Sequence, residues 1–200
     1  MIQSGEKKCA AVILAAGDST RMGRPKALLQ IDGVSFLQSI ILKLEKTGIT
    51  DIIIVLGRDF KQIEARISIR RQHQVIINPY PEQGPLSSIQ LALKELKPDT
   101  NGFLLILVDH PLVSQTTYQA ILAQADSGKI IIPVYNRKSG HPVYFGRKFF
   151  NDLVHAPLNE GARHVVHKYP QKVKKIEVPD DGILHDIDLP GDYEQYIAGK

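Results

Sequence analysis

Four short, largely apolar runs restrict the fold more narrowly than any other feature of the chain. They occupy residues 9–16, 51–56, 103–108 and 129–134, and each is bounded by Gly, Pro or Asp. Apolar runs of this length, without polar alternation, are typical of strands buried on both faces of a parallel sheet. Such a sheet requires helices on two sides.

Helical patterns separate these runs. Apolar residues recur at helical spacing in two segments, at Leu37, Ile40, Ile41 and Leu44 and again at Leu86, Ile89, Leu93 and Leu96. Gly48 and Pro98 follow the two segments as stop signals. Because strands and helices alternate, we predict an α/β fold with right-handed crossovers and a mainly parallel sheet.

The C-terminal third is less regular. Residues 140–145 are predicted to form a strand after a turn, 161–170 a short helix and 172–178 an alternating strand. We therefore expect a small antiparallel excursion on the parallel sheet. Since the chain has no internal repeat and no linker rich in Gly, Ser or Pro, we expect residues 1–200 to form a single domain.

The composition excludes several classes of protein. With 43% hydrophobic and 23% charged residues the chain is typical of a globular protein, and its net charge of +4 is too dispersed for the basic stripe that a nucleic acid requires. Cys9, the single cysteine, allows no intrachain disulfide, and the first apolar run is too short to span a membrane. We expect an untargeted, cytoplasmic, monomeric protein that binds neither nucleic acid nor membrane.

The stretch LAAGDSTRMGRPKALL, residues 14–29, follows the first predicted strand directly. A glycine-rich loop at the carboxyl end of a parallel sheet presents backbone N–H groups that bind phosphate. The spacing fits neither the dinucleotide fingerprint nor the P-loop, since five residues separate Gly17 from Gly23. What remains is a pair of cations, Arg21 and Lys26, after two alanines small enough to admit a flat base.

This loop resembles the L-A-A-G-x-S-x-R-M-G-x-x-K signature of the nucleotidyltransferases that resemble the molybdenum-cofactor guanylyl- and cytidylyltransferases. Further segments agree in the family's order: GPLSSIQLAL, VDHPLVS, GHPVYF, EGAR and DIDLPGDYE, at residues 84–93, 108–114, 140–145, 160–163 and 186–194. The last four are most similar to the cytidylyltransferase branch, which makes molybdopterin cytosine dinucleotide. The resemblance implies a Rossmann-like three-layer sandwich of the nucleotide-diphospho-sugar transferase type.

Asp109 ends an apolar run at the same predicted sheet edge as the phosphate loop. A carboxylate there suits Mg²⁺, which prefers one or two carboxylates together with phosphate oxygens, although Asp at a strand end also caps turns. The resemblance implies that Asp109 is a metal ligand.

Two more carboxylates, Asp186 and Asp188, share a face if the segment DIDLP is extended. They either complete a metal site or cap the helix that starts near Pro190. The resemblance implies a second metal-binding or substrate-orienting residue here without separating the two. We take Asp188 as a metal ligand and Asp186 as a substrate-binding residue.

Residues 78–89 contain too many turn formers to be anything but a loop. By resemblance this loop reads the base, with Asn78 or Glu82 as sources of base preference. His141, in a turn before a predicted strand, either faces the acceptor substrate or lies on the surface. The predicted nucleotide-binding set is Leu14, Ala15, Ala16, Gly17, Arg21, Lys26, Asn78, Gly84, Ser87 and Asp109, of which Arg21, Lys26 and Asp109 are predicted to be catalytic.

The resulting hypothesis is transfer of a nucleotidyl group to a phosphate-bearing acceptor, with Mg²⁺ as cofactor and pyrophosphate as leaving group. By resemblance the donor is CTP, the acceptor is molybdopterin or its molybdenum-loaded form, and a molybdoenzyme or its chaperone is a protein partner. Three alternatives stay open: a sugar-phosphate or other phosphomonoester nucleotidyltransferase, a non-catalytic nucleotide-binding regulator, and a dinucleotide-dependent oxidoreductase, which the missing fingerprint disfavours.

Overall fold

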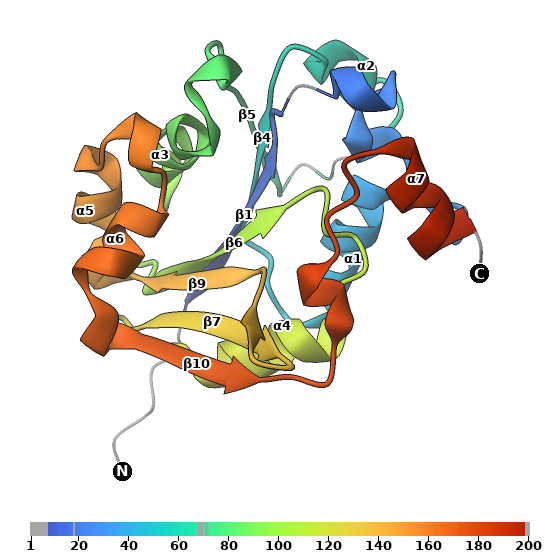
Figure 1. Ribbon diagram of the computed structural model, residues 1–200. Coiled ribbons are helices and arrows are strands. Elements are labelled where there is room, and N and C mark those ends of the chain that lie inside the picture. Colours follow the sequence, from blue (N-terminus) through green and yellow to red (C-terminus); the bar gives the residue numbers. More distant parts are fainter. Residues whose placement is uncertain (1–7, 18, 68–69, 71, 199–200) are drawn as a thin grey trace.

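A central sheet organises the molecule in the computed structural model, which describes residues 8–17, 19–67, 70 and 72–198 (Figure 1). Its strands lie in the order β10 (Val173–Glu177), β7 (Ile130–Tyr135), β9 (Val143–Gly146), β6 (Gly102–Leu107), β1 (Cys9–Ala15), β4 (Ile52–Leu56) and β5 (Gln74–Ile77). The short strand β8 (Lys138–Ser139) pairs with β7. A separate small sheet joins β2 (Gln30–Ile31) to β3 (Val34–Ser35).

The sheet is mainly parallel, as predicted. β5, β4, β1 and β6 run in one direction, and Ile13 of β1 lies opposite Ile54 of β4 and Ile106 of β6. β9 is antiparallel to both of its neighbours, β6 and β7, and β8 is antiparallel to β7. β10 returns to a parallel pairing with β7. The expected antiparallel excursion is therefore confirmed, and it consists of β8 and β9.

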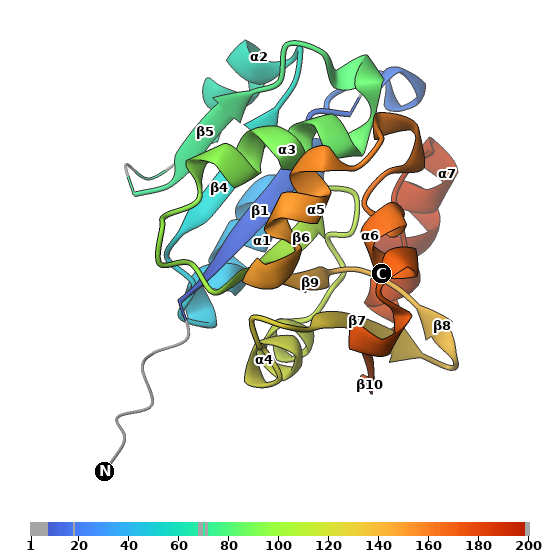
Figure 2. The same ribbon diagram turned by 90° about the vertical axis from the view of Figure 1, so that its left-hand side faces the viewer.

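Helices cover both faces of the sheet and complete a three-layer sandwich. One face carries α1 (Phe36–Lys46), α2 (Phe60–Glu64), α4 (Gln115–Ala123) and α7 (Pro190–Tyr193); the other carries α3 (Pro85–Glu95), α5 (Phe150–His155) and α6 (Arg163–Lys168), which face the viewer in Figure 2. Successive side chains of β1 point to opposite faces of the sheet. Ile13 belongs to the core on the α1 side, and Val12 belongs to the core on the α3 side.

The two predicted helices form where the apolar pattern placed them. α1 begins after Ser35, whose hydroxyl accepts a hydrogen bond from the Gln38 N–H at 3.3 Å. Its apolar positions Leu37, Ile40, Ile41 and Leu44 are at most 1% exposed. α3 begins with Pro85, which follows Gly84 at a φ of +89°, a backbone conformation that favours glycine.

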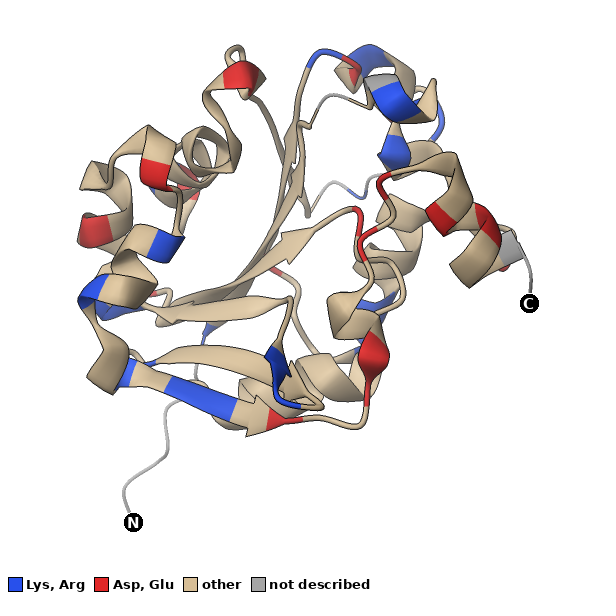
Figure 3. Ribbon diagram, in the orientation of Figure 1, with Lys and Arg blue, Asp and Glu red and all other residues tan. Residues whose placement is uncertain are grey.

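Residues of both charge signs are interspersed along the ribbon of the sandwich (Figure 3). On the edge strand β10, Lys174 and Lys175 are exposed, which discourages pairing of this free edge with another strand. Within the described ranges, each helix falls short of the length and apolar character that crossing a lipid bilayer demands.

Candidate active site

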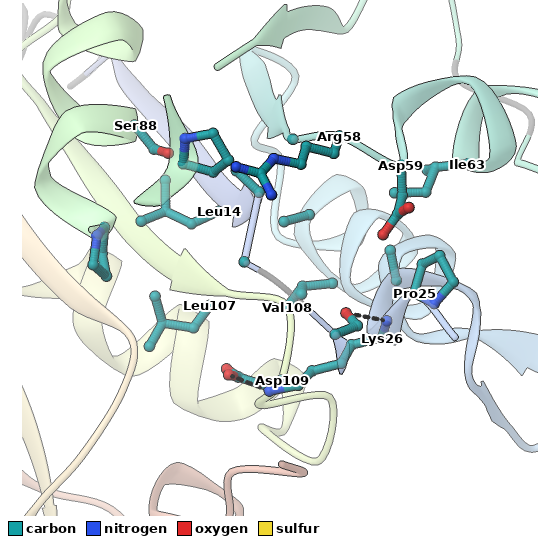
Figure 4. Close-up of a pocket in the computed structure, with 18 of the residues that line it drawn as sticks. Leu14, Pro25, Lys26, Arg58, Asp59, Ile63, Ser88, Leu107, Val108 and Asp109 are labelled. Atoms are coloured by element: carbon teal, nitrogen blue, oxygen red, sulfur yellow. Dashed lines mark hydrogen bonds and ion pairs between the residues drawn. The ribbon is translucent and has the colours of Figure 1, made fainter. Parts of the chain in front are cut away.

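A pocket of about 330 Å³ lies at the carboxyl ends of the parallel strands, where α/β sheets bind ligands (Figure 4). Four segments line it: the end of β1 with the loop after it, the loop between β4 and α2 with part of α2, the loop between β5 and α3 with the start of α3, and the end of β6. We call it the carboxyl-edge pocket. Its volume falls in the range of small-molecule sites.

The loop after β1 folds back on itself and presents Lys26 to the pocket. The Lys26 backbone N–H donates to the Ser19 hydroxyl at 3.1 Å, and Gly23 adopts a φ of +66°. Ala27 and Leu29 are buried at 2% and 0% exposure and anchor the far end of the loop in the core. Asp18, within the quoted signature, lies outside the described residues.

Three segments far apart in sequence meet at the Lys26 ammonium group. Its Nζ lies 3.3 Å from Oδ2 of Asp109, which follows β6, and also contacts Oδ1 of Asp188, which precedes α7. The Lys26 side chain is only 15% exposed. Arg21 is different: it is 69% exposed, lies outside the pocket lining and approaches Asp188 at 3.8 Å.

Asp109 is held as a carboxylate by its neighbours. Burial alone would raise its pKa, but a 3.0 Å hydrogen bond and the charge of His110, together with the Lys26 ammonium, outweigh burial and lower the pKa below its ordinary value. The two carboxylate oxygens of Asp109 have different partners, since Oδ1 faces His110 and Oδ2 faces Lys26. The orientation of the group is fixed from two sides.

Asp186 and Asp188 lie in different surroundings. Ile187, between them, is fully buried and donates its N–H to the Asp109 carbonyl at 2.8 Å, which ties this segment to the end of β6. Asp188 turns toward Lys26 and Arg21, while Asp186 is exposed and outside the pocket lining. Asp192 fixes the segment further by accepting the N–H groups of Asp188 and Leu189.

The donor set of Asp109 and Asp188 fits a divalent cation. Both carboxylates contact one ammonium group, so they are near enough to serve one ion, and they supply hard oxygen ligands. In the described residues, no third His, Cys, Asp or Glu joins them to form a closed metal cluster. Mg²⁺ and similar ions commonly take their remaining ligands from phosphate oxygens and water.

The loop before α3 places its predicted residues at different depths. Asn78 is 2% exposed and donates to the hydroxyls of Ser87 and Ser88 at 2.9 Å each, while its Oδ1 accepts the Tyr80 N–H. Ser87 in turn donates to the Gly84 carbonyl at 2.7 Å. Asn78 and Ser87 therefore organise the loop from inside, and Gly84 and Ser88 line the pocket.

His141 lies beside Asp109 rather than on the open surface. Its ring meets the His110 ring edge-on at a centroid distance of 5.1 Å, and its buried Nδ1 has no hydrogen-bond partner. Burial, reinforced by the neighbouring His110, lowers the pKa of His141 to about 4 despite the opposing charge of Asp109. His141 is thus neutral near pH 7 and sits outside the pocket lining.

The structure brings most of the predicted nucleotide-binding set together at one pocket. Leu14, Ala15, Ala16, Gly17, Lys26, Gly84 and Asp109 line it, whereas Arg21, Asn78 and Ser87 do not. The predicted substrate-binding residues His141 and Asp186 and the predicted metal ligand Asp188 also lie outside the lining. Sequence reasoning missed the loop after β4, where Arg58 and Asp59 contribute to the lining (Figure 4). The sequence could have indicated these two residues, because they follow a buried strand at the same sheet edge, as Asp109 does.

Fold and site together define a nucleotidyltransferase: a three-layer α/β sandwich with a glycine-rich loop, a lysine and paired carboxylates at the carboxyl edge of its sheet. The model of the MobA-like NTP transferase domain matches residues 11–173, and the chain belongs to this family. The membership predicted from the signature is confirmed.

Two relatives are similar over most of their length. The nicotine blue oxidoreductase of Paenarthrobacter nicotinovorans is 27% identical over 186 residues, 88% of this chain and 90% of that protein. A probable molybdenum cofactor guanylyltransferase from Bacillus mycoides is 28% identical over 159 residues, 78% of this chain and 76% of that protein. With the bifunctional protein GlmU of Prochlorococcus marinus, 28% identical, this chain spans only 32% of the relative's length.

The crystal structure of Rv0371c from Mycobacterium tuberculosis H37Rv shares the fold. It superposes with a TM-score of 0.86 at 27% identity, covering 96% of this chain and 98% of that one. A second crystal structure of Rv0371c is a complex with manganese. These comparisons confirm the predicted nucleotide-diphospho-sugar transferase type of fold.

Proposed function

We propose that the chain transfers CMP from CTP to molybdopterin, or to its molybdenum-loaded form, and releases pyrophosphate. One observation carries the proposal: the Lys26 ammonium is shared by Asp109 and Asp188 at the edge of a pocket that the glycine-rich loop lines. A binding module would not require this arrangement of charge. The segments that resemble the cytidylyltransferase branch favour CTP.

The chemistry proposed for the site is largely electrostatic. A phosphate oxygen of the acceptor attacks the α-phosphorus in line, the bond to the bridging oxygen breaks, and pyrophosphate leaves with that oxygen. Lys26 and the more exposed Arg21 stabilise the charge that develops on the leaving group, and the backbone N–H groups near Gly17 orient the phosphates. Asp109 and Asp188 would hold Mg²⁺, which when bound supplies further positive charge to the triphosphate.

The remaining predicted residues have supporting roles in this proposal. Gly84 approaches the base directly, Asn78 and Ser87 hold the loop that does so, and His141 and Asp186 are assigned to the acceptor side. The neutral state of His141 suits a hydrogen bond to a phosphate oxygen or a polar ring atom more than an ion pair.

Pyrophosphate release tests the proposal. The protein is incubated with Mg²⁺ and CTP, GTP, ATP or UTP in turn, with and without molybdopterin, and release is expected with CTP only when the pterin is present. Lys26→Ala and Asp109→Ala should each reduce turnover by ~10²–10³, whereas Lys94→Ala, an exposed lysine at the end of α3, should not. Near wild-type turnover in both active-site variants would contradict the mechanism.

A second candidate acceptor is a sugar phosphate, because the family that the signature resembles also contains enzymes that act on sugar phosphates. Replacing molybdopterin with hexose 1-phosphates in the same assay distinguishes the two acceptors. Oxidation of NADH and NADPH is followed in parallel, since one relative bears the name of an oxidoreductase. Oxidation of either dinucleotide without pyrophosphate release would replace the transferase proposal.

A further inference from the structure

Two charged side chains meet across the carboxyl-edge pocket and have no role in the mechanism above. Arg58 comes from the loop between β4 and α2, and Glu82 from the turn Pro81–Gln83 before α3. Nη2 of Arg58 lies 3.2 Å from Oε2 of Glu82, and both residues line the pocket. The ion pair therefore links two of the four segments that enclose it.

The backbone holds Arg58 beside the glycine-rich loop. At Gly57, the preceding residue, a Cβ would lie 2.5 Å from the carbonyl oxygen of Ala16, so the end of β4 approaches the end of β1 as closely as only glycine permits. From this fixed origin the Arg58 side chain extends across the pocket in the direction of Ser88 and α3 (Figure 4). The Arg58 side chain thus lies over the lining of the pocket while most of its surface stays exposed.

The ion pair itself lies at an exposed position. The Arg58 and Glu82 side chains are 73% and 55% exposed, and ion pairs at such exposure contribute little to stability. A ligand that offers a partner to the face of the guanidinium can therefore be bound at small cost while the edge of the guanidinium stays paired with Glu82.

The surroundings point to a flat ring as that partner. A guanidinium is planar and stacks on aromatic faces, which an ammonium cannot do. Beside the Arg58 loop, Ala15 and Ala16 line the pocket and are small enough to let a base lie against the backbone at the end of β1. A base that lies there would be within reach of the Arg58 guanidinium, which extends over the same lining (Figure 4).

We propose that Arg58 binds the nucleotide by stacking its guanidinium on the base, and that Glu82 is a positioning residue that holds Arg58 in reach. This inference rests on the proposed function, because it takes the occupant of the pocket to be a nucleoside triphosphate. Stacking on any base is favourable, so Arg58 contributes affinity for the nucleotide and leaves the choice among bases to other groups.

Binding calorimetry on the wild-type protein and its variants tests the inference with two kinds of probe, the four nucleoside triphosphates and inorganic tripolyphosphate, which lacks a base. For the tightest nucleotide, Arg58→Ala should weaken binding by about 2- to 30-fold, the range for one cation–π contact from exposed to desolvated. Tripolyphosphate affinity should change less than about twofold. Arg58→Lys, which keeps the charge but not the plane, should resemble Arg58→Ala.

The outcomes separate this inference from the proposed function. If the wild type binds no nucleoside triphosphate, the proposed function fails first. If the wild type binds one but Arg58→Ala binds it equally well, loses tripolyphosphate affinity in parallel, or is matched to wild type by Arg58→Lys, only the stacking role is overturned. Arg66→Ala, an exposed arginine just after α2, is the matched control and should bind normally.

A double-mutant cycle tests Glu82 separately. Glu82→Ala should weaken nucleotide binding in the wild-type background and have no effect in the Arg58→Ala background, because Glu82 acts through Arg58. An equal effect in both backgrounds would overturn the positioning role. Thermal unfolding of each variant verifies that these exposed substitutions leave the protein folded.

Discussion

Lys26 contacts two residues that are far from it in the sequence, and this environment explains why lysine suits the position. A single flexible ammonium contacts Asp109 and Asp188 at once while the loop around it is fixed by Ser19. Lys26 and Asp109 could be predicted because each follows a strand at one sheet edge. Arg58 could have been found by the same rule. The buried orientation of Asn78 could not be predicted, because it depends on hydrogen bonds to Ser87 and Ser88 that no sequence pattern indicates.

The two neighbouring aspartates provide a matched pair at this scale. Asp188→Asn should lower turnover by roughly 10², because it removes a carboxylate from Lys26 and from the divalent-ion donor set. Asp186→Asn, two residues away and exposed, should have a much smaller effect on turnover under the same conditions. The rates of pyrophosphate release measure both, and a larger loss in Asp186→Asn would show that the two assignments must be exchanged.

His141 makes stability depend on pH in a specific window. Burial holds its pKa near 4 in the folded protein, against an ordinary value of 6.5 in the unfolded chain. As the pH falls from 6.5 to 4 the unfolded state binds a proton that the folded state refuses, so stability is lost across this window. His110 and Asp109, which face His141, set the balance of charge around it.

Replacing His141 should remove this acid sensitivity. Between pH 7 and pH 4, the free energy of unfolding of His141→Gln should rise relative to wild type by up to about 3 kcal/mol. Urea denaturation at several pH values measures the difference, with His155→Gln, an exposed histidine on α5, as the control. A difference that stays constant with pH would contradict the buried neutral state of His141.

Most secondary-structure elements were predictable, including β9, α6 and β10, which coincide with the segments 140–145, 161–170 and 172–178 of the less regular C-terminal third. The four apolar runs became β1, β4, β6 and β7, and the periodic segments became α1 and α3. The edge strand β5 has only four residues, and α4 buries few large side chains, so neither produces a clear period in the sequence. Short elements of this kind form because the neighbouring sheet gives them a surface to pack on.

The junction of β4 with β1 gives a prediction at the scale of elements. Gly57→Ala should destabilise the fold by about 1–3 kcal/mol, because its Cβ would lie 2.5 Å from the Ala16 carbonyl oxygen and force two central strands apart. Gly191→Ala, in α7, meets nothing within 4 Å and is the control. Thermal unfolding compares the two, and equal melting temperatures would mean that the strand ends can separate freely.

At the scale of the whole molecule, the segment after β10 runs from this edge of the sheet back to Lys26 and α1. After β10, Ile183 and Ile187 enter the core, and α7 brings Tyr193 against Phe36 with a ring distance of 6.2 Å. Tyr193 also donates its hydroxyl to the Gln30 carbonyl at 2.8 Å. The motif DIDLP could be recognised in the sequence. The position of this C-terminal segment in the fold could not be predicted, because it depends on contacts with residues early in the chain, such as Phe36 and Gln30.

Removal of residues 185–200 should therefore reduce both stability and turnover. The truncation uncovers part of the core around Ile187 and removes Asp188, so the melting temperature should fall by several degrees and pyrophosphate release at least as far as in Asp188→Asn. The full-length Asp188→Asn protein separates the two effects, since it loses the carboxylate but keeps the packing. A truncated protein with wild-type stability would show that α7 is dispensable for the fold.

The contact between Lys26 and Asp188 also has a consequence for the synthesis of the protein on the ribosome. A chain is synthesised from its amino terminus, and the early strands can begin to assemble while later ones are still being made. Lys26 emerges 162 residues before Asp188, its second carboxylate partner. A nascent chain can thus form much of the pocket and still lack its full charge cluster, which would keep it from turning over nucleotide until Asp188 has been added.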